Sequence, residues 1–433
     1  MAEPIEAVVI GAGLRGRDTY GAYALENPEQ LRVVAVAEPD QECREVFASA
    51  HGLPRERCFQ DWHDLLRRPA LARVAIIATP DHLHVGPALA AIERAYDVLL
   101  EKPIAPRPAD CLRVVEAADA AAGCLLQIGH CLRYTAFYAR VHEIMASGRL
   151  GRLITLSMAE HVGFWHMTHA FVRGKWGSTK NAAPMILAKC CHDLDLMAWF
   201  VEQPCLRVAS FGSLRHFRPQ DAPPGAPERC TDGCPVEETC VHYAPRFYLK
   251  EFSGWPWSDV SLATDLETRR RALETGPYGR CVYRARNDVV DHQVLALDFE
   301  DGVTATFTMH GFAAVPARTI RASGTLGELR GTFEKGEIEV HMHGQISPEV
   351  IRIPFTPVGH GGGDEGLLRH FVDVVRRGAA DEVLASGRVA LESHLIAFAA
   401  ERSRIEGRLV EMADFRAEVA AALASETGKT PGG

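Results

Sequence analysis

The sequence predicts an α/β protein in which a doubly wound parallel sheet is followed by a second domain rich in antiparallel strands. The chain has 433 residues, which is too long for one ordinary core and favours two packed domains. Apolar strand-like runs alternate with helical segments up to about residue 130, as they do in parallel sheets. Between 294 and 344 the pattern alternates strictly and carries hairpin signals. We therefore expect one domain over 1–130 and a second over 131–433.

The composition narrows the class of protein. Hydrophobic residues make up 47% of the chain and charged residues 24%, as in an ordinary globular enzyme. The net charge of −9 argues against a nucleic-acid partner, because phosphate binding needs a basic face. We find neither an apolar run of the ~20 residues that span a bilayer nor a signal sequence, so we expect a cytoplasmic protein without a membrane partner. Twelve cysteines should then be thiols or metal ligands.

A glycine-rich turn follows the first predicted strand. The segment "AVVIGAGLRGRDTYGAYAL" reads as strand, turn and helix, with Gly11, Gly13 and Gly16 forming GxGxxG. In this context the first glycine permits a tight turn, the second lets a pyrophosphate approach the backbone, and the third lets the helix pack on the strand. The alternative is an ordinary glycine-rich turn. The motif favours a Rossmann-type dinucleotide site.

An acidic residue then distinguishes between the two nicotinamide cofactors. The second strand, "LRVVAVAEPD", ends in Glu38, 22 residues after Gly16. A carboxylate at this position accepts hydrogen bonds from a ribose 2′-hydroxyl and repels a 2′-phosphate. We therefore expect NAD, while Arg15 and Arg17 keep NADP open as an alternative.

Two more strands end in polar loops. "RVAIIATPDHLH" leads into Thr79, Pro80 and the loop to His84, and "YDVLLEKPIA" ends in Glu101, Lys102 and a proline. Ligands bind at the carboxyl ends of strands in doubly wound sheets, so both loops should face the cofactor.

The order of GxGxxG, "ATPDHLH" and "EKP" resembles the Gfo/Idh/MocA oxidoreductases over nearly the whole chain. The resemblance implies an NAD-binding Rossmann domain and a C-terminal α+β domain whose open, largely antiparallel sheet covers the active site and mediates assembly, here as a homodimer or homotetramer. It also places Lys102 near the nicotinamide and the reacting hydroxyl. The expected cofactor contacts are Gly11, Gly13, Leu14, Arg15, Gly16, Glu38, Thr79, Pro80, His82, His84, Glu101, Lys102 and His130.

A candidate base lies in "ILAKCCHDLDLMAW". If the chain is helical from Met185 onward, Lys189 and His192 share a face. The family commonly carries an acid four residues before this histidine, but here that position is Ala188. Two alternatives could replace this acid. Lys189 would act as a substrate-binding cation, or Asp193 or Asp195 would orient the imidazole. We expect His192 to be the general acid/base, with Lys102 as the rival base and a buried core histidine as the alternative.

Other polar residues are candidate substrate contacts. "QIGHCLRYTAFYARV" resembles the family's junction between domains, and "HAFVRGKW" resembles a subgroup pattern ahead of the candidate base. The alternative for each is packing, and Asp364 is a further candidate in the glycine-rich loop "GHGGGDEG". The expected substrate contacts are Arg133, Tyr134, His169, Arg173, Trp176, Lys189, Asp193 and His360.

A cysteine-rich insert interrupts the pattern at about 204–290. Cys230, Cys234 and Cys240 form C-x3-C-x5-C in an irregular loop, which is typical of tetrahedral zinc. On a continuous helix Cys190 would lie roughly 160° from His192 at about 100° per residue, and it could supply the fourth ligand. The alternatives are His242 or Cys191 as the fourth ligand, or thiols without metal. A closed site of four ligands would be structural.

The sequence thus predicts an NAD-dependent oxidoreductase that acts on a hydroxyl of a small carbohydrate, glycoside or cyclitol. Three alternatives stay open. Some members of the family that the chain resembles hydrolyse glycosides by transient oxidation with tightly bound NAD, and some are regulators without catalysis. The third alternative is a dehydrogenase with a catalytic zinc ion.

Overall fold

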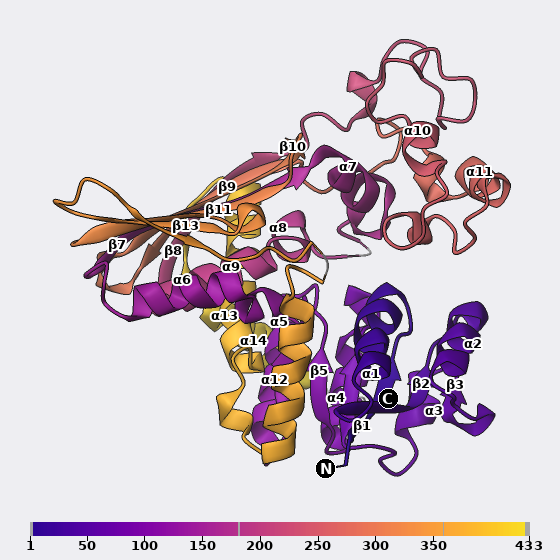
Figure 1. The fold of residues 1–433 in the computed structure, drawn as a ribbon, viewed down its shortest axis with the longest axis horizontal. Coiled ribbons are helices and arrows are strands. Elements are labelled where there is room, and N and C mark those ends of the chain that lie inside the picture. The colour runs from indigo at the N-terminus through magenta and orange to yellow at the C-terminus, as the bar shows by residue number, and fades with distance from the viewer. Residues whose placement is uncertain (1–2, 181, 358, 429–433) are drawn as a thin grey trace.

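The computed structural model describes residues 3–180, 182–357 and 359–428. Figure 1 shows one lobe around a six-stranded sheet, a second lobe around a nine-stranded sheet, and a projecting segment that carries α10 and α11. The predicted combination of a parallel sheet and a largely antiparallel sheet is confirmed. No helix in the described part of the chain is long and apolar enough to cross a membrane.

The first sheet is parallel throughout and has the strand order β3-β2-β1-β4-β5-β6 of a dinucleotide-binding fold. Its strands are β1 (Ile5–Ile10), β2 (Leu31–Ala37), β3 (Cys58–Phe59), β4 (Val74–Ile77), β5 (Asp97–Leu100) and β6 (Leu126–Ile128). The connecting helices are α1 (Ala22–Glu26), α2 (Gln41–Ala50), α3 (Trp62–Leu66), α4 (Val85–Glu93) and α5 (Pro108–Ala120). Strands β4 and β5 are wholly buried, as expected for a sheet with helices on both faces.

One helix of this layer comes from the far end of the chain. Helix α12 (Gly363–Arg377) buries Leu367 and Phe371 in the same apolar cluster as Val9 and Val36 of the first sheet. Residues well beyond the predicted boundary at 130 thus complete the core of the first lobe.

The second sheet has the order β14-β13-β12-β11-β7-β10-β9-β8-β15 and is antiparallel except for the pair β7–β10. Its strands are β7 (Leu153–Gly163), β8 (Cys205–Ser213), β9 (His292–Phe299), β10 (Thr304–Ala313), β11 (Ala317–Gly324), β12 (Gly327–Thr332), β13 (Glu337–Met342), β14 (Glu349–Arg352) and β15 (Val410–Glu411). The helices α6 (Ala136–Ala146), α9 (Cys191–Val201), α13 (Gly387–Glu406) and α14 (Met412–Thr427) pack against it or against one another. Phe211, Val294 and Phe312 remain exposed on the sheet.

The cysteine-rich insert begins later than its predicted start at 204, because β8 already belongs to the second sheet. The insert is therefore residues 214–291, the segment between β8 and β9. Its two α-helices are α10 (Ala244–Tyr248) and α11 (Leu266–Thr275), and three 3-10 turns accompany them. Its own core is small: the buried members are Cys230, Ala244, Tyr248 and Leu273.

Candidate active site

The glycine-rich turn after β1 has the geometry that a dinucleotide requires. Gly11 has φ +92°, and a Cβ on it would lie 2.7 Å from the carbonyl carbon of Ala78. A Cβ on Gly16 would lie 1.9 Å from the carbonyl oxygen of Gly11, whereas a Cβ on Gly13 would meet no atom within 4 Å. The first and third glycines thus allow close packing, and the second leaves open backbone for a pyrophosphate.

Glu38, at the end of β2, lies beside this turn. Its carboxylate accepts hydrogen bonds from the main-chain N–H groups of Ala12, at 2.7 Å, and Asp40, at 3.0 Å. The two arginines that would favour NADP are both engaged: Arg17 pairs with Asp18, and Arg15 is held by acids deeper in the site. The residues present therefore fit NAD, since a carboxylate disfavours a 2′-phosphate here.

The loop after β4 contributes one candidate contact and one structural histidine. The Thr79 hydroxyl is buried and has no hydrogen-bond partner among the described residues. The ring nitrogens of His84 lie 2.9 Å from the carbonyl oxygen of Thr79 and 2.7 Å from that of Pro103. His84 therefore ties the loops after β4 and β5 together, while Pro80 and His82 are exposed.

A buried cluster joins the turn to the second lobe. The Arg15 guanidinium donates hydrogen bonds to Glu101 and, through both terminal nitrogens, to Asp364 at 2.9 and 3.0 Å. Tyr20 donates its hydroxyl hydrogen to Glu101 at 2.6 Å. Burial opposes ionisation of Glu101, but the charges of Arg15 and Lys102 together with the hydrogen bonds from Tyr20 and Arg15 outweigh it and lower the pKa of this carboxyl. Arg15 and Glu101 thus connect the dinucleotide loop to α12 rather than standing free for a ligand.

Lys102, at the end of β5, reaches across to the second lobe. Its Nζ donates a hydrogen bond to the main-chain carbonyl of Ala188, at 3.1 Å. The expected continuous helix from Met185 is wrong, because α8 (Met185–Ala188) ends there and α9 begins at Cys191. The break lies between the two helices, at Lys189 and Cys190.

His192 occupies the first turn of α9 with its imidazole unsatisfied. The residue is 3% exposed, and neither ring nitrogen has a hydrogen-bond partner within the described residues. Burial, reinforced by the charge of Lys102, holds the pKa of His192 well below its usual value. The ring is therefore neutral and able to accept a proton.

The two carboxylates expected to orient this imidazole are engaged elsewhere, so that expectation is wrong. Asp193 accepts a hydrogen bond from Arg318 at 2.9 Å, and Asp195 pairs with Arg133 at 2.6 Å. Burial raises the pKa of Asp193 to about 6 although Arg318 opposes the shift.

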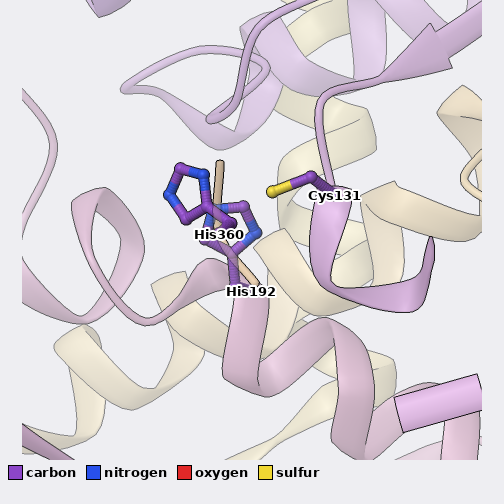
Figure 2. Close-up of side chains that lie close together, drawn as sticks. All are labelled: Cys131, His192 and His360. Atoms are coloured by element: carbon purple, nitrogen blue, oxygen red, sulfur yellow. The ribbon is translucent and has the colours of Figure 1, made fainter. Parts of the chain in front are cut away.

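Three histidine rings line this part of the site. Ring centroids of His130 and His192 lie 5.5 Å apart, and those of His192 and His360 lie 5.6 Å apart. Burial lowers the pKa of His130 to about 4, and both of its ring nitrogens are unpartnered in the described structure. Figure 2 shows Cys131, His192 and His360, whose potential ligand atoms all lie within 4.8 Å of one another. His360 also faces Asp364, with Nδ1 3.0 Å from the carboxylate.

The residues of the domain junction make contacts inside the protein. Arg133 is buried and gives Asp195 two hydrogen bonds, at 2.6 and 2.9 Å. Tyr134 packs its ring against His370, with centroids 5.2 Å apart, while its hydroxyl has no hydrogen-bond partner among the described residues. The use of the Arg133 donors inside the protein favours a structural role for this residue over the predicted substrate contact.

Lys189 belongs to a second ion-pair network. Its Nζ lies 3.4 Å from Glu160 on β7, and Glu160 also pairs with Arg318. Arg318 in turn pairs with Oδ1 of Asp193, while Oδ2 of Asp193 is buried without a hydrogen-bond partner among the described residues. Glu160 and Arg318 come from strands far from Lys189 in sequence, and sequence analysis missed both.

The segment "HAFVRGKW" attaches the insert. His169 is fully buried, with one ring nitrogen 2.9 Å from the Tyr248 hydroxyl and the other 3.1 Å from Asp259. Arg173 donates to the carbonyl oxygens of Arg280, at 2.7 Å, and His242, at 2.6 Å. Their hydrogen-bond partners all lie in the insert, which favours an anchoring role for both residues over the predicted substrate contacts.

Two aromatic residues that sequence analysis missed, His166 and Trp255 of the insert, contact each other near the site. His166 in α7 (Phe164–His166) packs its ring edge against Trp255, with centroids 4.9 Å apart. Burial lowers the pKa of His166, and the charges of Lys189 and His360 contribute. His166 is thus near the candidate site, and its position directly after β7 was the available signal. The predicted contact Trp176 instead packs near Phe171, with centroids 6.1 Å apart.

The predicted metal ligands are only partly assembled. Cys230, Cys234 and Cys240 line one small cavity, together with Cys281 and His242. Cys190 is not among the lining residues; it is buried in the main core, where the nearest charged groups include Asp193 and Glu160. The expectation that Cys190 completes the site is wrong, because this residue is buried in the main core and does not line the cavity of the insert.

Two family models match the chain. Residues 5–130 match the Gfo/Idh/MocA model described as an oxidoreductase family with an NAD-binding Rossmann fold. Residues 143–412 match the model of the C-terminal alpha/beta domain of the same family.

Several curated proteins are similar in sequence. A putative oxidoreductase, YteT, from Bacillus subtilis is 24% identical over 341 residues, which cover 75% of this chain and 77% of the relative. An inositol 2-dehydrogenase from Streptomyces avermitilis is 31% identical over 263 residues, which cover 60% of this chain and 66% of that enzyme. About a third of the length of this inositol 2-dehydrogenase thus lies outside the match.

Solved structures share the fold. A levoglucosan dehydrogenase in complex with NADH and levoglucosan has a TM-score of 0.70 at 18% identity, covering 95% of this chain and all of that one (100%). A scyllo-inositol dehydrogenase from Lactobacillus casei, with bound NAD(H) and scyllo-inositol, has a TM-score of 0.67 at 15% identity and the same coverage of 95% and 100%.

Proposed function

The chain belongs to the Gfo/Idh/MocA family of NAD-binding oxidoreductases, and from this premise we propose that it transfers hydride between NAD and a hydroxyl-bearing carbon of a sugar, glycoside or cyclitol. When bound, NAD supplies the hydride acceptor. The observation that carries the proposal is the approach of Lys102, at the end of β5, to the segment that holds His192.

The two residues have complementary roles in this proposal. His192 is neutral and buried with unpartnered ring nitrogens, so it accepts the proton of the substrate hydroxyl. Lys102 is held by the Ala188 carbonyl and presents a positive charge that polarises the substrate oxygen. The buried surroundings strengthen both effects, because charges interact more strongly away from water.

The substrate class rests on two observations. The relatives include enzymes named for inositol, and the structural neighbours include complexes with levoglucosan and scyllo-inositol. In this chain, His166 and Trp255 provide flat rings near the site, a surface suited to the apolar face of a sugar ring. Both observations favour a small polyhydroxylated ring.

The test is NADH formation with a panel of cyclitols, hexoses and glycosides. We expect turnover with at least one of them, and a large loss in Lys102→Met and His192→Asn. Wild-type turnover that both variants retain would contradict the assignment.

A second candidate is a glycosidase that oxidises its substrate transiently and keeps NAD bound. The insert favours it, because Trp255 packs on His166 beside the site and could exclude water from a retained cofactor. Incubation with an aryl glycoside and no added NAD separates the two functions. Release of the phenol without net NADH formation supports the glycosidase, and NADH accumulation supports the dehydrogenase.

The two remaining alternatives have simple tests. Turnover with any sugar excludes a regulator without catalysis. A catalytic metal would have Cys131, His192 and His360 as its ligand set. Metal analysis of the His192→Ala variant tests the catalytic-metal alternative, since an ion bound by these three residues would be lost with the imidazole.

For assembly we propose a homodimer or homotetramer formed through the open face of the second sheet. The exposed side chains of Phe211, Val294 and Phe312 on that sheet support it. Light scattering of the wild type and of Phe211→Asp tests the proposal, with dissociation expected in the variant.

A further inference from the structure

Four cysteine thiols of the insert surround one cavity. Cys230, Cys234, Cys240 and Cys281 line a cavity of about 10 Å³, which is the size of a single water molecule or ion. None of the four forms a disulfide. Three of these residues lie within 11 positions of one another, whereas Cys281 arrives from a distant part of the insert.

Backbone pairing brings Cys281 to the other three. Arg229 and Arg280 form an isolated antiparallel bridge, in which Cys230 N donates to Gly279 O at 2.9 Å and Cys281 N donates to Glu228 O at 3.0 Å. Cys230 and Cys281 are therefore diagonal neighbours on one face of a two-stranded pairing, where side chains lie close enough to share a ligand.

A buried cation faces the thiols. Arg173 is 6% exposed, and its guanidinium donates a hydrogen bond to Cys230 Sγ at 3.6 Å. Four thiolates around a divalent ion carry two excess negative charges, so a buried guanidinium that donates to a sulfur stabilises that state. His242 also lines the cavity, and its Nδ1 is buried without a partner in the described structure.

We propose that Cys230, Cys234, Cys240 and Cys281 bind one structural zinc ion that fixes the insert beside the candidate active site. Four sulfur ligands in a tetrahedron are the common structural set for zinc. A Zn–S distance of about 2.3 Å places the sulfurs about 3.8 Å apart. In the described residues, three ligand atoms come within 4.8 Å of one another only at Cys131, His192 and His360. The four insert sulfurs must therefore close in when the ion binds.

The site would supply stability that the insert lacks. The buried core of the insert has four residues, one of which is Cys230 itself. Tyr248 of this core contacts His169. Arg173 donates hydrogen bonds to two main-chain carbonyls of the insert, those of Arg280 and His242. An ion bound here would consequently restrain both the insert and the segment that follows α7. The proposal is independent of the reaction catalysed, because all four ligands lie outside the candidate active site.

Metal content tests the proposal directly. We expect elemental analysis of the protein, purified without chelators, to find one zinc ion per chain. Cys281→Ser and Cys234→Ser should each lose at least nine-tenths of it. The matched controls Cys190→Ser, Cys43→Ser and His192→Ala should retain it. Loss of zinc in His192→Ala with retention in Cys281→Ser would place the ion at the histidines and overturn the proposal, as would iron in place of zinc.

The fourth ligand has its own test. His242→Ala should keep its zinc if Cys281 is the ligand. Loss in His242→Ala together with retention in Cys281→Ser would overturn the assignment of Cys281 in favour of three cysteines and a histidine.

A measurement on the unaltered chain covers the case in which a cysteine variant fails to fold. Thiols of the native wild type are titrated with a disulfide reagent before and after zinc removal by a chelator. We expect four additional thiols to react after removal, in step with zinc release. An intact mass that shows disulfides among these cysteines, without zinc, would overturn the proposal.

Discussion

The Lys102 ammonium donates a hydrogen bond to the main-chain carbonyl of Ala188, at 3.1 Å. A carbonyl oxygen can hold a lysine in place without neutralising its charge. Burial is the main cause of the lowered pKa of the His192 imidazole, and the charge of Lys102 adds to this shift. The contact with Ala188 thus positions Lys102 while its charge still acts on His192.

Replacing Lys102 by methionine should lower kcat/KM by about 10²–10⁴-fold, since methionine cannot polarise the substrate oxygen. NAD affinity, measured by fluorescence titration, should change little. Lys102→Arg keeps the charge and serves as the control, with partial activity expected. A methionine variant of normal kcat/KM would exclude Lys102 from the chemistry.

The acidic limb of the pH profile should lie below the ordinary histidine pKa of 6.5. The reaction requires neutral His192, and burial lowers its pKa, so activity persists as the pH falls past 6.5 and is lost only when the ring protonates. The profile of log kcat/KM against pH measures this limb. His192→Gln should remove it, and a limb at or above pH 6.5 would count against His192 as the base.

Glu38→Ala should raise the KM for NAD by about 10–100-fold, the cost of losing hydrogen bonds to a charged group. The ratio of kcat/KM for NADP to that for NAD should rise, because the repulsion of a 2′-phosphate is removed. Glu38→Gln separates charge from shape, since it retains an acceptor for the Ala12 N–H. An unchanged cofactor ratio in both variants would place the ribose elsewhere.

Arg133→Met should destabilise the fold rather than weaken substrate binding. The partner of Arg133, Asp195, is 2% exposed, and an unpaired buried carboxylate costs about 3–5 kcal/mol of the free energy of unfolding. Denaturant titration gives the loss, and the double variant Arg133→Met/Asp195→Leu should recover most of it. A stable single variant with a raised substrate KM would restore the substrate role.

Trp255→Ala should raise the KM for the sugar substrate several-fold and leave NAD affinity unchanged. The indole packs against His166 beside the site, while all the predicted dinucleotide contacts lie in the first lobe or at its edge. Initial-rate measurements with each substrate varied in turn provide the test. A change confined to NAD would contradict this placement.

Sequence patterns predicted those features that depend only on residues close together in the sequence. Gly11, Gly13 and Gly16 occur within six residues, so their spacing alone specifies the turn, and Glu38 and Lys102 follow from the ends of strands. The parallel first sheet and the largely antiparallel second sheet were likewise accessible, because alternation and periodicity act over a few residues.

Contacts between distant segments could not be predicted in this way. From the sequence alone, Arg133 has no evident acidic partner. In the structure it pairs with Asp195, which lies 62 positions away. Arg173 bonds to Arg280 across 107 positions. Cys190 was expected beside the insert from the geometry of a continuous helix, but it is buried in the main core, and the helix itself is interrupted after α8.

Helix α12 has a consequence for how the protein is made. Val9 and Val36 emerge early from the ribosome, but Leu367 and Phe371, which belong to the same buried apolar cluster, are translated more than 300 positions later. Chains grow at about 5–20 residues per second, so this apolar surface stays uncovered for many seconds during synthesis. A fragment ending at residue 130 would keep that surface exposed permanently. The core of the first lobe therefore needs residues from both ends of the sequence. It can be completed only when the chain is nearly fully synthesised.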